Sequence, residues 1–341
     1  MRVLVTGHKG YIGTIMVPML QKAGHDVLGI DSDLYRNSTY GKAIPETQEI
    51  LKDIRDIEKE DLKGVEGIIH LAGLSNDMLG DLNPEMTYEI NHAASVRLAE
   101  MAKELGIARF VFASSCSNYG AASDGMQDEN AELNPVTPYA VSKVRVERDL
   151  GKMADDNFSP TFMRNATAYG VSPRMRFDIV LNNLTAWAYT TGNVLLKSDG
   201  TPWRPLVHIE DISLAAIGAL ETPRELIHNE AFNVGINSEN YQMRQLAEFV
   251  KEVVPNCEIE FAAGAGPDKR NYRVDFSKYT KTFPKHQLSW DARRGAQDIY
   301  ESYRKYGLQK DDYEGPKYKR IAQLKYLLGS DQLDNSLRWK N

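Results

Sequence analysis

The sequence predicts an α/β protein built on a doubly wound parallel sheet. Two observations carry this prediction. Short apolar segments alternate along the first half of the chain with longer segments of helical hydrophobic spacing. A glycine-rich turn also joins the first apolar segment to the first helical one. Neighbouring parallel strands need crossover connections, which the helices supply, so we expect helices on both faces of the sheet.

The predicted elements follow one another in a regular order. Apolar strands are expected at 3–5, 27–30, 67–71 and 110–113, which are the first, second, fourth and fifth strands, and a third strand is expected before Asp53. Helices are expected over 12–20, 84–105 and 138 to about 155. Pro84 and Pro138 suit the first turns of their helices, Gly106 suits the end of one, and Pro18 interrupts the first pattern.

After residue 165 the predicted strands and helices no longer alternate regularly. We expect a cofactor domain at 1–165 and a smaller α/β substrate-binding region at 166–341, from which segments such as 204–235 can return to the first domain. The last stretch, 308–341, is interpreted as a helix and tail packed on the surface, with a role that stays open.

Composition excludes several classes of function. The 341 residues carry a net charge of −6 spread along the chain, which argues against a nucleic-acid partner. No stretch of 18 apolar residues is present, so we expect no membrane-spanning segment. The two cysteines, Cys116 and Cys257, make neither a disulfide framework nor a metal site, so we expect a reducing cytoplasm and no metal.

The turn after the first strand has the form of a phosphate-binding loop. Its glycines follow the spacing G-x-x-G-x-x-G, and the residues concerned are Gly7, Gly10, Tyr11, Ile12 and Gly13. The glycines permit a tight turn, a close approach of backbone to a diphosphate, and close packing of helix on sheet. The helix N-terminus then favours an anion. This predicts a Rossmann dinucleotide site.

Acidic and small residues at other strand ends extend this site. Asp31 ends the second strand, where a carboxylate bonds the ribose 2′-OH and repels a 2′-phosphate, so NAD is favoured over NADP. His8 and Lys9 are basic and near the phosphates, so NADP remains possible as the cofactor. Asp53 and Ile54 follow the third strand, where adenine would lie, although an acidic loop is the plainer alternative. The fourth strand ends in further candidate cofactor contacts: Leu71, Ala72 and Gly73.

Three residues predict hydride-transfer chemistry. Tyr139 and Lys143 stand four residues apart on a predicted helix and share one face. An ammonium group there, with the positive nicotinamide ring, would lower the tyrosine pKa from its usual value near 10 and make a phenolate base. Ser115 ends the fifth strand and could hold the substrate oxygen. Both Tyr139 and Lys143 should also contact the cofactor.

Taken together, these motifs resemble the extended short-chain dehydrogenase/reductases, the NAD-dependent epimerase/dehydratase family. The resemblance covers about residues 1–300 and rests on TGHKGYIG at 6–13, Asp31, HLAG at 70–73, SSCSNYG at 114–120, PYAVSK at 138–143, RPLVHIEDI at 204–212 and NYRVDFSK at 271–278. It implies bound NAD, a Ser-Tyr-Lys triad and a nucleoside-diphosphate-sugar substrate. It also implies a homodimer formed through the helices at 84–105 and 138–155.

The resemblance also suggests substrate contacts. Arg204 and Arg270 match positions where arginines contact the substrate diphosphate, which suits a planar guanidinium. Asn182 or Asn183 could hold the sugar or diphosphate, or could simply face water. The remaining candidates lie near the strand ends: Ser75, Ser117, Asn118 and Thr167.

Departures from the family pattern narrow the reaction. Where 4,6-dehydratases carry Asp-Glu after the catalytic Ser/Thr, this chain has Cys116 and Ser117, which disfavours dehydration. Thr167 stands where a substrate-contacting asparagine is common. We therefore expect an NAD-dependent nucleotide-sugar epimerase, most simply at C4 through a transient 4-keto sugar. The alternatives are a nucleotide-sugar dehydrogenase or ketoreductase, and a non-catalytic nucleotide-binding protein.

Overall fold

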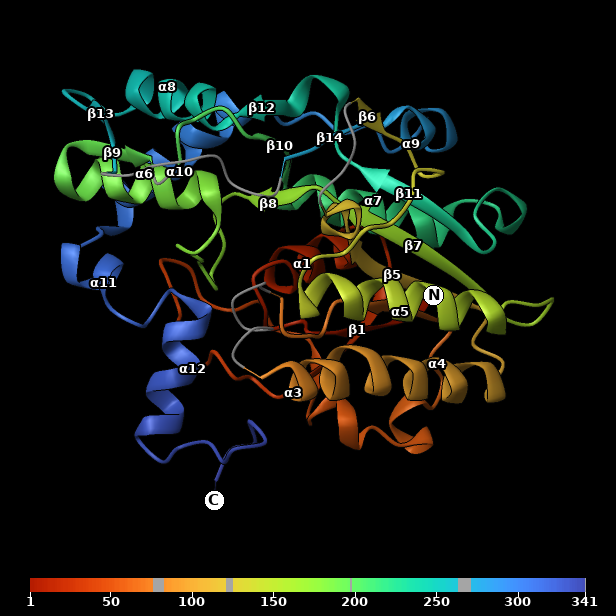
Figure 1. The fold of residues 1–341 in the computed structure, drawn as a ribbon. Coiled ribbons are helices and arrows are strands. Elements are labelled where there is room, and N and C mark those ends of the chain that lie inside the picture. Colours follow the sequence, from red (N-terminus) through yellow and green to blue (C-terminus); the bar gives the residue numbers. More distant parts are fainter. Residues whose placement is uncertain (76–82, 121–124, 197, 263–270, 341) are drawn as a thin grey trace.

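A seven-stranded parallel sheet forms the centre of the N-terminal part (Figure 1). The computed structural model describes residues 1–75, 83–120, 125–196, 198–262 and 271–340. In spatial order, the strands are β11 (Glu230–Val234), β7 (Ser159–Asn165), β5 (Arg109–Ser115), β4 (Gly67–His70), β1 (Arg2–Thr6), β2 (Asp26–Asp31) and β3 (Gln48–Leu51). The order reverses its direction between β1 and β4. This confirms the doubly wound fold and places a ligand crevice at that switch point.

Helices cover both faces of this sheet. On one face α1 (Gly13–Lys22) packs against α7 (Ile209–Glu221), and on the other α4 (Ala94–Glu104) packs against α5 (Pro138–Met153) (Figure 1). The side chains of β1 show why two layers are needed. Val3 and Val5 belong to the core on one face, while Leu4 belongs to the core on the other, and all three are fully buried.

The predicted helix at 84–105 consists of three consecutive pieces. They are α3 (Pro84–Tyr88), a π-helical turn at Glu89–Ala93, and α4. Its start follows the expected cap chemistry, because Asn83 accepts a hydrogen bond from the Met86 amide and Pro84 follows it directly. Thr137 caps α5 in the same way through the Ala140 amide.

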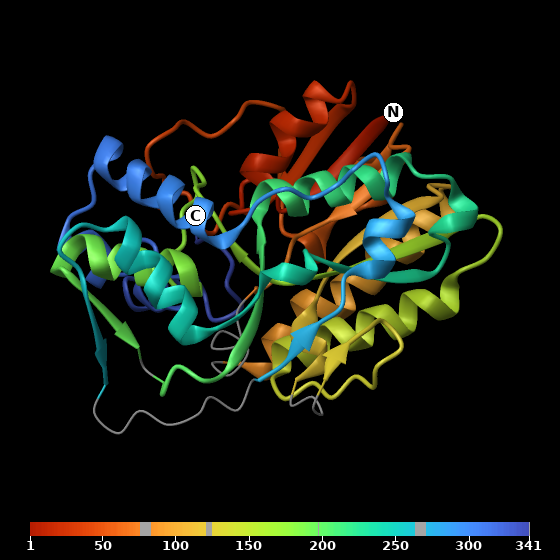
Figure 2. The same ribbon diagram turned by 90° about the horizontal axis from the view of Figure 1, so that it is seen from above.

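Smaller sheets and helices make up most of the C-terminal part. Its strands are β8 (Thr167–Tyr169), β9 (Asn193–Leu196), β10 (Trp203–His208), β12 (Asn240–Gln242) and β13 (Glu258–Phe261), and short β6 (Met126–Gln127) pairs with β14 (Arg273–Val274). Its helices are α6 (Val180–Thr191), α8 (Met243–Val253), α9 (Ser277–Thr282) and α10 (Ala292–Tyr306). Seen from above, α6, α8 and α10 lie beside the large sheet (Figure 2).

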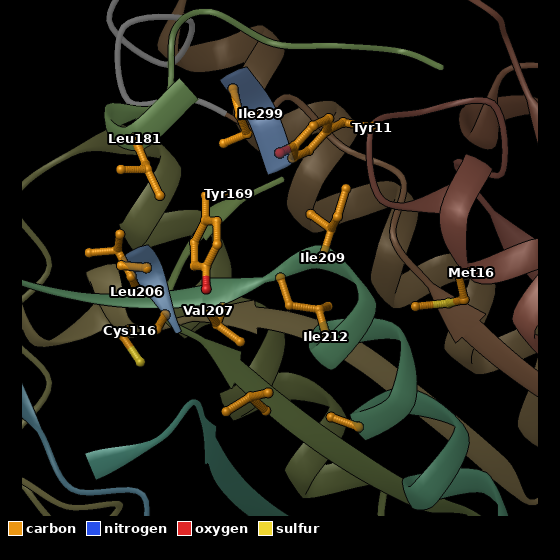
Figure 3. Packing of buried hydrophobic residues seen from close by; sticks show 14 of the residues in the cluster. Tyr11, Met16, Cys116, Tyr169, Leu181, Leu206, Val207, Ile209, Ile212 and Ile299 are labelled. Atoms are coloured by element: carbon orange, nitrogen blue, oxygen red, sulfur yellow. The ribbon is translucent and has the colours of Figure 1, made fainter. Parts of the chain in front are cut away.

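One hydrophobic core joins the two parts. Tyr11 of the glycine turn, Tyr169 of β8, Leu181 of α6, Ile209 of α7 and Ile299 of α10 belong to the same buried cluster (Figure 3). The chain also crosses between the parts repeatedly, because β11 returns to pair with β7 in the large sheet. Within the described residues, no helix is long and apolar enough to cross a membrane.

The end of the chain differs from its prediction. Residues 308–340, here called the C-terminal arm, contain α11 (Lys310–Glu314), α12 (Arg320–Gly329) and an isolated bridge between Leu333 and Trp339. Its two helices pack on different parts: α11 packs against α6 of the C-terminal part, and α12 packs against the N-terminal part. Leu324 and Leu327 are fully buried in the same cluster as Leu28 and Ile54. Their spacing places both leucines on one face of α12, which explains the burial.

Candidate active site

A pocket opens at the carboxyl ends of β1, β2 and β4, at the switch point of the sheet. It brings together every residue predicted to bind the cofactor outside the catalytic helix: Gly7, Gly10, Tyr11, Ile12, Gly13, Asp31, Asp53, Ile54, Leu71, Ala72 and Gly73. Ser75, predicted to contact the substrate, also lines it. Ser32, Leu34, Tyr35, Leu74, Ile90, Ala168, Arg176, Arg320 and Leu337 complete the lining.

The glycine turn has no room for side chains at two positions. Gly7 adopts φ of +77°, and a Cβ there would lie 2.9 Å from the Ala72 amide nitrogen. A Cβ on Gly13 would lie 2.3 Å from the Gly7 carbonyl oxygen. The backbone is therefore tightly folded at the start of α1, where unpaired amides and the helix dipole favour a phosphate group.

Asp31 is held in place at the end of β2. Its carboxylate accepts hydrogen bonds from the Lys9 amide at 2.9 Å and from the Asp33 amide at 2.8 Å. Burial raises the pKa of this carboxyl group. The amides hold the oxygens in fixed positions within the pocket, as the contact with a ribose hydroxyl requires.

His8 and Lys9, the two basic residues that left NADP possible as the cofactor, both face Glu49. The Lys9 ammonium lies 3.0 Å from the Glu49 carboxylate and 3.5 Å from Asp33, while the His8 ring lies 3.0 Å from Glu49. The carboxylates of Glu49 and Asp33 therefore balance the positive charge that would otherwise bind a 2′-phosphate. This arrangement fits NAD rather than NADP.

The catalytic residues predicted from sequence lie on two neighbouring elements. Ser115 ends β5, and its hydroxyl oxygen accepts hydrogen bonds from the amide and the hydroxyl of Ser117, at 3.1 and 2.9 Å. Tyr139 and Lys143 lie on α5, which packs against β5. The Lys143 ammonium donates to the Ala113 carbonyl oxygen at 2.7 Å and lies 5.8 Å from the centre of the Tyr139 ring.

The environment of Lys143 changes its acidity. The side chain is almost entirely buried and lies 4.5 Å from the centre of the Phe112 ring. Burial lowers the pKa of Lys143 to about 8, and the carboxylate of Glu147, one turn further along α5, opposes this shift. The ammonium form is thus present at neutral pH, next to the tyrosine that it would help to ionise.

A buried polar network that sequence reasoning missed supports this site. Glu147 pairs with Arg164 of β7 at 2.7 Å, and each side chain is 7% exposed. Arg164 also donates to the hydroxyl of Tyr119. Ser114 donates to the Glu147 carboxylate. The position of Glu147 four residues after Lys143 was the one available signal.

Asn91 was also missed. Its side-chain oxygen accepts from the Leu74 amide at 2.7 Å, and its side-chain nitrogen donates to the Leu74 carbonyl at 3.0 Å and to the Ser142 hydroxyl at 3.2 Å. It therefore ties the loop after β4 to the catalytic helix. Asn91 lies in the π-helical turn, which no pattern in the sequence predicts.

Two residues predicted to contact the substrate are fully buried. Asn182 is fully buried, and its amide bonds to the Gly170 backbone, the Tyr11 hydroxyl and the Arg176 carbonyl. Asn118 is also fully buried and donates to Ser114 and Glu147. These hydrogen bonds direct the Asn182 amide and the Asn118 side-chain nitrogen into the protein interior.

The other predicted substrate residues fall into three groups. Asn183 donates to the Phe177 carbonyl and the Tyr313 hydroxyl, which directs its amide into the protein. Thr167 is half-buried on β8, directly before the pocket-lining Ala168, and Arg204 is buried on β10 with its guanidinium on the Trp203 carbonyl. Arg270 lies outside the described residues.

Cys116 is a packed residue. It is 1% exposed, and its thiol donates to the Arg164 carbonyl oxygen at 3.1 Å. Burial raises the thiol pKa well above its usual value. Among the described residues, no group of three or more His, Cys, Asp or Glu side chains is placed to hold a metal ion.

Comparison with known proteins identifies the family. The model of the NAD dependent epimerase/dehydratase family matches residues 3–235. The chain belongs to this family. Among curated relatives, a UDP-glucose 4-epimerase of Bacillus subtilis (strain 168) is 25% identical over 88% of this chain and 94% of its own. A UDP-glucuronic acid decarboxylase of Arabidopsis thaliana is 26% identical over 92% of this chain and 72% of its own.

Solved structures of the family agree with the fold. MoeE5, in complex with UDP-glucose and NAD, is 26% identical and aligns with a TM-score of 0.76 over 89% of this chain and 99% of its own. The NDP-hexosamine 5,6-dehydratase TunA is 21% identical and aligns with a TM-score of 0.79. The family is NAD-dependent, and the pocket around Asp31 fits that cofactor.

Proposed function

We propose that the protein is an NAD-dependent nucleoside-diphosphate-sugar epimerase that inverts C4 of its substrate through a transient 4-keto sugar. The observation that carries the proposal is the pairing of the dinucleotide pocket with Tyr139 and Lys143 on one helix. The relatives support the epimerase class, since several of them are named UDP-glucose 4-epimerases. The complex of MoeE5 with UDP-glucose and NAD supports the substrate class.

The cofactor site would hold NAD along the carboxyl edge of the sheet. The amides at the start of α1 would receive its diphosphate, and Asp31 would bond the adenosine ribose. Asp53 and Ile54 line the pocket, and the adenine would lie beside them. NAD supplies hydride acceptance and hydride return at the reacting carbon.

The catalytic residues remove the proton of the reacting hydroxyl and later return it. Tyr139 removes this proton when the carbon is oxidised and gives it back when the hydride returns. The ammonium of Lys143 stabilises the phenolate form of Tyr139. The Ser115 hydroxyl, already oriented by Ser117, donates to the substrate oxygen. Tyr139 and Ser115 thus act on the same substrate oxygen atom, while Lys143 acts through Tyr139.

Water elimination is disfavoured by the two residues that follow Ser115. Elimination requires an additional acid and base near the sugar. The Cys116 thiol is buried against the Arg164 carbonyl and remains protonated, and the Ser117 hydroxyl faces Ser115. Neither side chain supplies a carboxylate, so we place the protein with the epimerases rather than the dehydratases.

The remaining organisation follows from the same proposal. We propose that residues 1–165 bind the cofactor and that most of 166–341 binds the sugar, with α7 and β11 returning to the cofactor part. We also propose a cytoplasmic homodimer in which α4 and α5 form the contact between subunits. Size-exclusion chromatography with light scattering tests the dimer.

The decisive experiment starts with freshly purified protein. We expect denaturation to release NAD, identified by mass spectrometry, and we expect one nucleotide sugar from a panel to yield its 4-epimer without net NADH. Tyr139→Phe should retain NAD and lose epimerisation by a factor of about 100 to 10,000. Net reduction of added NAD by a sugar would instead indicate the dehydrogenase alternative. Full activity in the Tyr139→Phe variant would refute the mechanism.

A further inference from the structure

We propose that the C-terminal arm completes the NAD site: Arg320 binds the cofactor's diphosphate, and the chain end around Leu337 and Trp339 closes the adenosine side of the pocket. This inference rests on NAD binding, which the proposed function also needs, but it does not depend on any sugar chemistry. It assigns a cofactor-binding role to residues far from the glycine turn in sequence.

Arg320 is a buried cation that faces the cofactor pocket. It is the first residue of α12, lines the pocket and is 2% exposed. One of its guanidinium nitrogens, Nη2, donates to the Arg174 carbonyl at 3.0 Å. The other, Nη1, is buried and has no hydrogen-bond partner among the residues that the structure describes. An unpaired buried donor is costly, so an anionic ligand is expected beside it.

The surroundings of Arg320 strengthen this expectation. Its guanidinium carbon lies 3.9 Å from the centre of the Tyr35 ring, which also lines the pocket and holds the side chain in place. Burial lowers the pKa of Arg320 to about 10, and the positive charge of Arg176 contributes to this shift. A bound diphosphate would offset both effects, since it replaces lost hydration and separates like charges.

Arg176 provides a second positive group in the same pocket. It pairs with Asp178 at 2.9 Å and donates to the Ser75 hydroxyl at 3.1 Å. Asp178 also accepts a hydrogen bond from the Arg320 amide at 3.3 Å, which fixes the start of α12. The pocket therefore combines two buried guanidinium groups with the amides of the glycine turn. Asp178 balances the charge of Arg176, so Arg320 supplies the donor that is unpartnered among the described residues for a diphosphate oxygen.

The end of the arm is fastened to loops on the adenosine side. The Trp339 indole donates to the Ser32 carbonyl at 2.8 Å, and the Arg36 guanidinium lies 3.4 Å from the centre of the same ring. Arg55, which follows Asp53 and Ile54, donates to the Ser336 carbonyl at 2.8 Å.

Leu337 lies within this fastened stretch. It lines the pocket and has a φ of +60°, an uncommon conformation for leucine. Its neighbour Arg338 pairs with Asp56. The chain end is therefore held on the loops that follow β2 and β3, so we infer that NAD leaves or enters only when these contacts open.

The alignment with MoeE5 is consistent with an added element. It covers 99% of MoeE5 but 89% of this chain, so about a tenth of this chain has no counterpart there. An epimerase must retain its cofactor between the two hydride transfers, and an arm across the pocket would slow dissociation.

Binding experiments on protein stripped of nucleotide test the role of Arg320. In Arg320→Met, we expect affinity for NAD and for ADP-ribose to fall by about 10- to 100-fold, the range for a hydrogen bond to a charged group. Affinity for adenosine, which lacks phosphate, should change less than about threefold. Lys325→Met is the matched control, because Lys325 is exposed on the same helix, and should bind all three ligands like the wild type.

The outcomes separate this proposal from the proposed function. Unchanged NAD affinity in Arg320→Met, or an equal loss of adenosine affinity, would overturn the assignment of Arg320 to the diphosphate. Wild-type protein that binds NAD but epimerises no sugar would refute the proposed function and leave this inference standing. Failure of the wild type to bind NAD would overturn both.

A second measurement tests closure by the chain end. We expect NAD to slow amide hydrogen exchange in residues 331–340, and Trp339→Ala to speed NAD dissociation several-fold. The chain end does not close the pocket if NAD leaves hydrogen exchange in this segment unchanged and Trp339→Ala releases NAD at the wild-type rate.

Discussion

The Glu147 carboxylate pairs with the Arg164 guanidinium at 2.7 Å, in a buried network between α5, which carries Tyr139 and Lys143, and β7. Removing one partner of such a pair leaves an uncompensated charge in the interior. We therefore expect Glu147→Gln to lower the free energy of unfolding by about 3–5 kcal/mol. Urea denaturation followed by circular dichroism measures this change. Glu258→Gln, which removes an exposed partner of Lys251, is the control and should leave the midpoint unchanged.

The pH dependence of catalysis should report the ionisation of Lys143. Burial lowers its pKa to about 8, so the ammonium form prevails below pH 8 and is lost above it. Because the phenolate of Tyr139 needs that ammonium, kcat should fall as the pH rises through 8.

Matched variants identify the group responsible. Lys143→Arg keeps its charge to higher pH, so the alkaline fall should move beyond pH 10 even if the rate is lower. Lys152→Arg, on the exposed face of the same helix, should keep the wild-type profile. An alkaline fall at pH 8 that persists in Lys143→Arg would mean that another group titrates.

Close packing at the glycine turn predicts the effect of one methyl group. A Cβ on Gly13 would lie 2.3 Å from the Gly7 carbonyl oxygen, so Gly13→Ala must displace the turn that receives the diphosphate. We expect NAD affinity to fall by at least about tenfold, as measured by calorimetry. Gly329→Ala places a methyl group in open space and should bind NAD normally. Normal NAD affinity in Gly13→Ala would contradict the placement of the diphosphate.

Cofactor preference should depend on the charge of Asp31. Its carboxylate is oriented by two backbone amides, and it would repel a 2′-phosphate. Asp31→Asn removes that repulsion, so the ratio of NAD to NADP affinity should fall by at least about tenfold. Asp26→Asn, at the exposed start of the same strand, is the control. An unchanged ratio in Asp31→Asn would show that another group excludes the phosphate.

Much of the cofactor site could be predicted because its residues stand next to recognisable element ends. The glycine turn, Asp31 and Leu71–Gly73 each follow an apolar strand, and parallel strands bring their carboxyl ends to one edge. Tyr139 and Lys143 share a helix face by spacing alone. These relationships are local in the sequence or follow directly from the sheet, so they needed no knowledge of long-range packing.

The remaining parts depend on contacts between distant segments. Nothing near Arg320 or Leu337 indicates that the arm returns to a pocket formed by the first 90 residues. The family resemblance suggested that Asn182 or Asn183 holds the sugar or diphosphate, and the structure turns the Asn182 amide inward toward Tyr11. The direction in which a helix face points is set by its packing partners, which the sequence of α6 alone does not reveal.

The place of the arm in the chain has a consequence for biosynthesis. A ribosome makes the protein from its N-terminus, so the strands and glycine turn that form the pocket emerge well before Arg320, Leu337 and Trp339. Until these residues have emerged, the growing polypeptide has a pocket without this part of its lining. The arm that we propose to close over NAD is therefore added after the strands and the glycine turn that would receive the nucleotide.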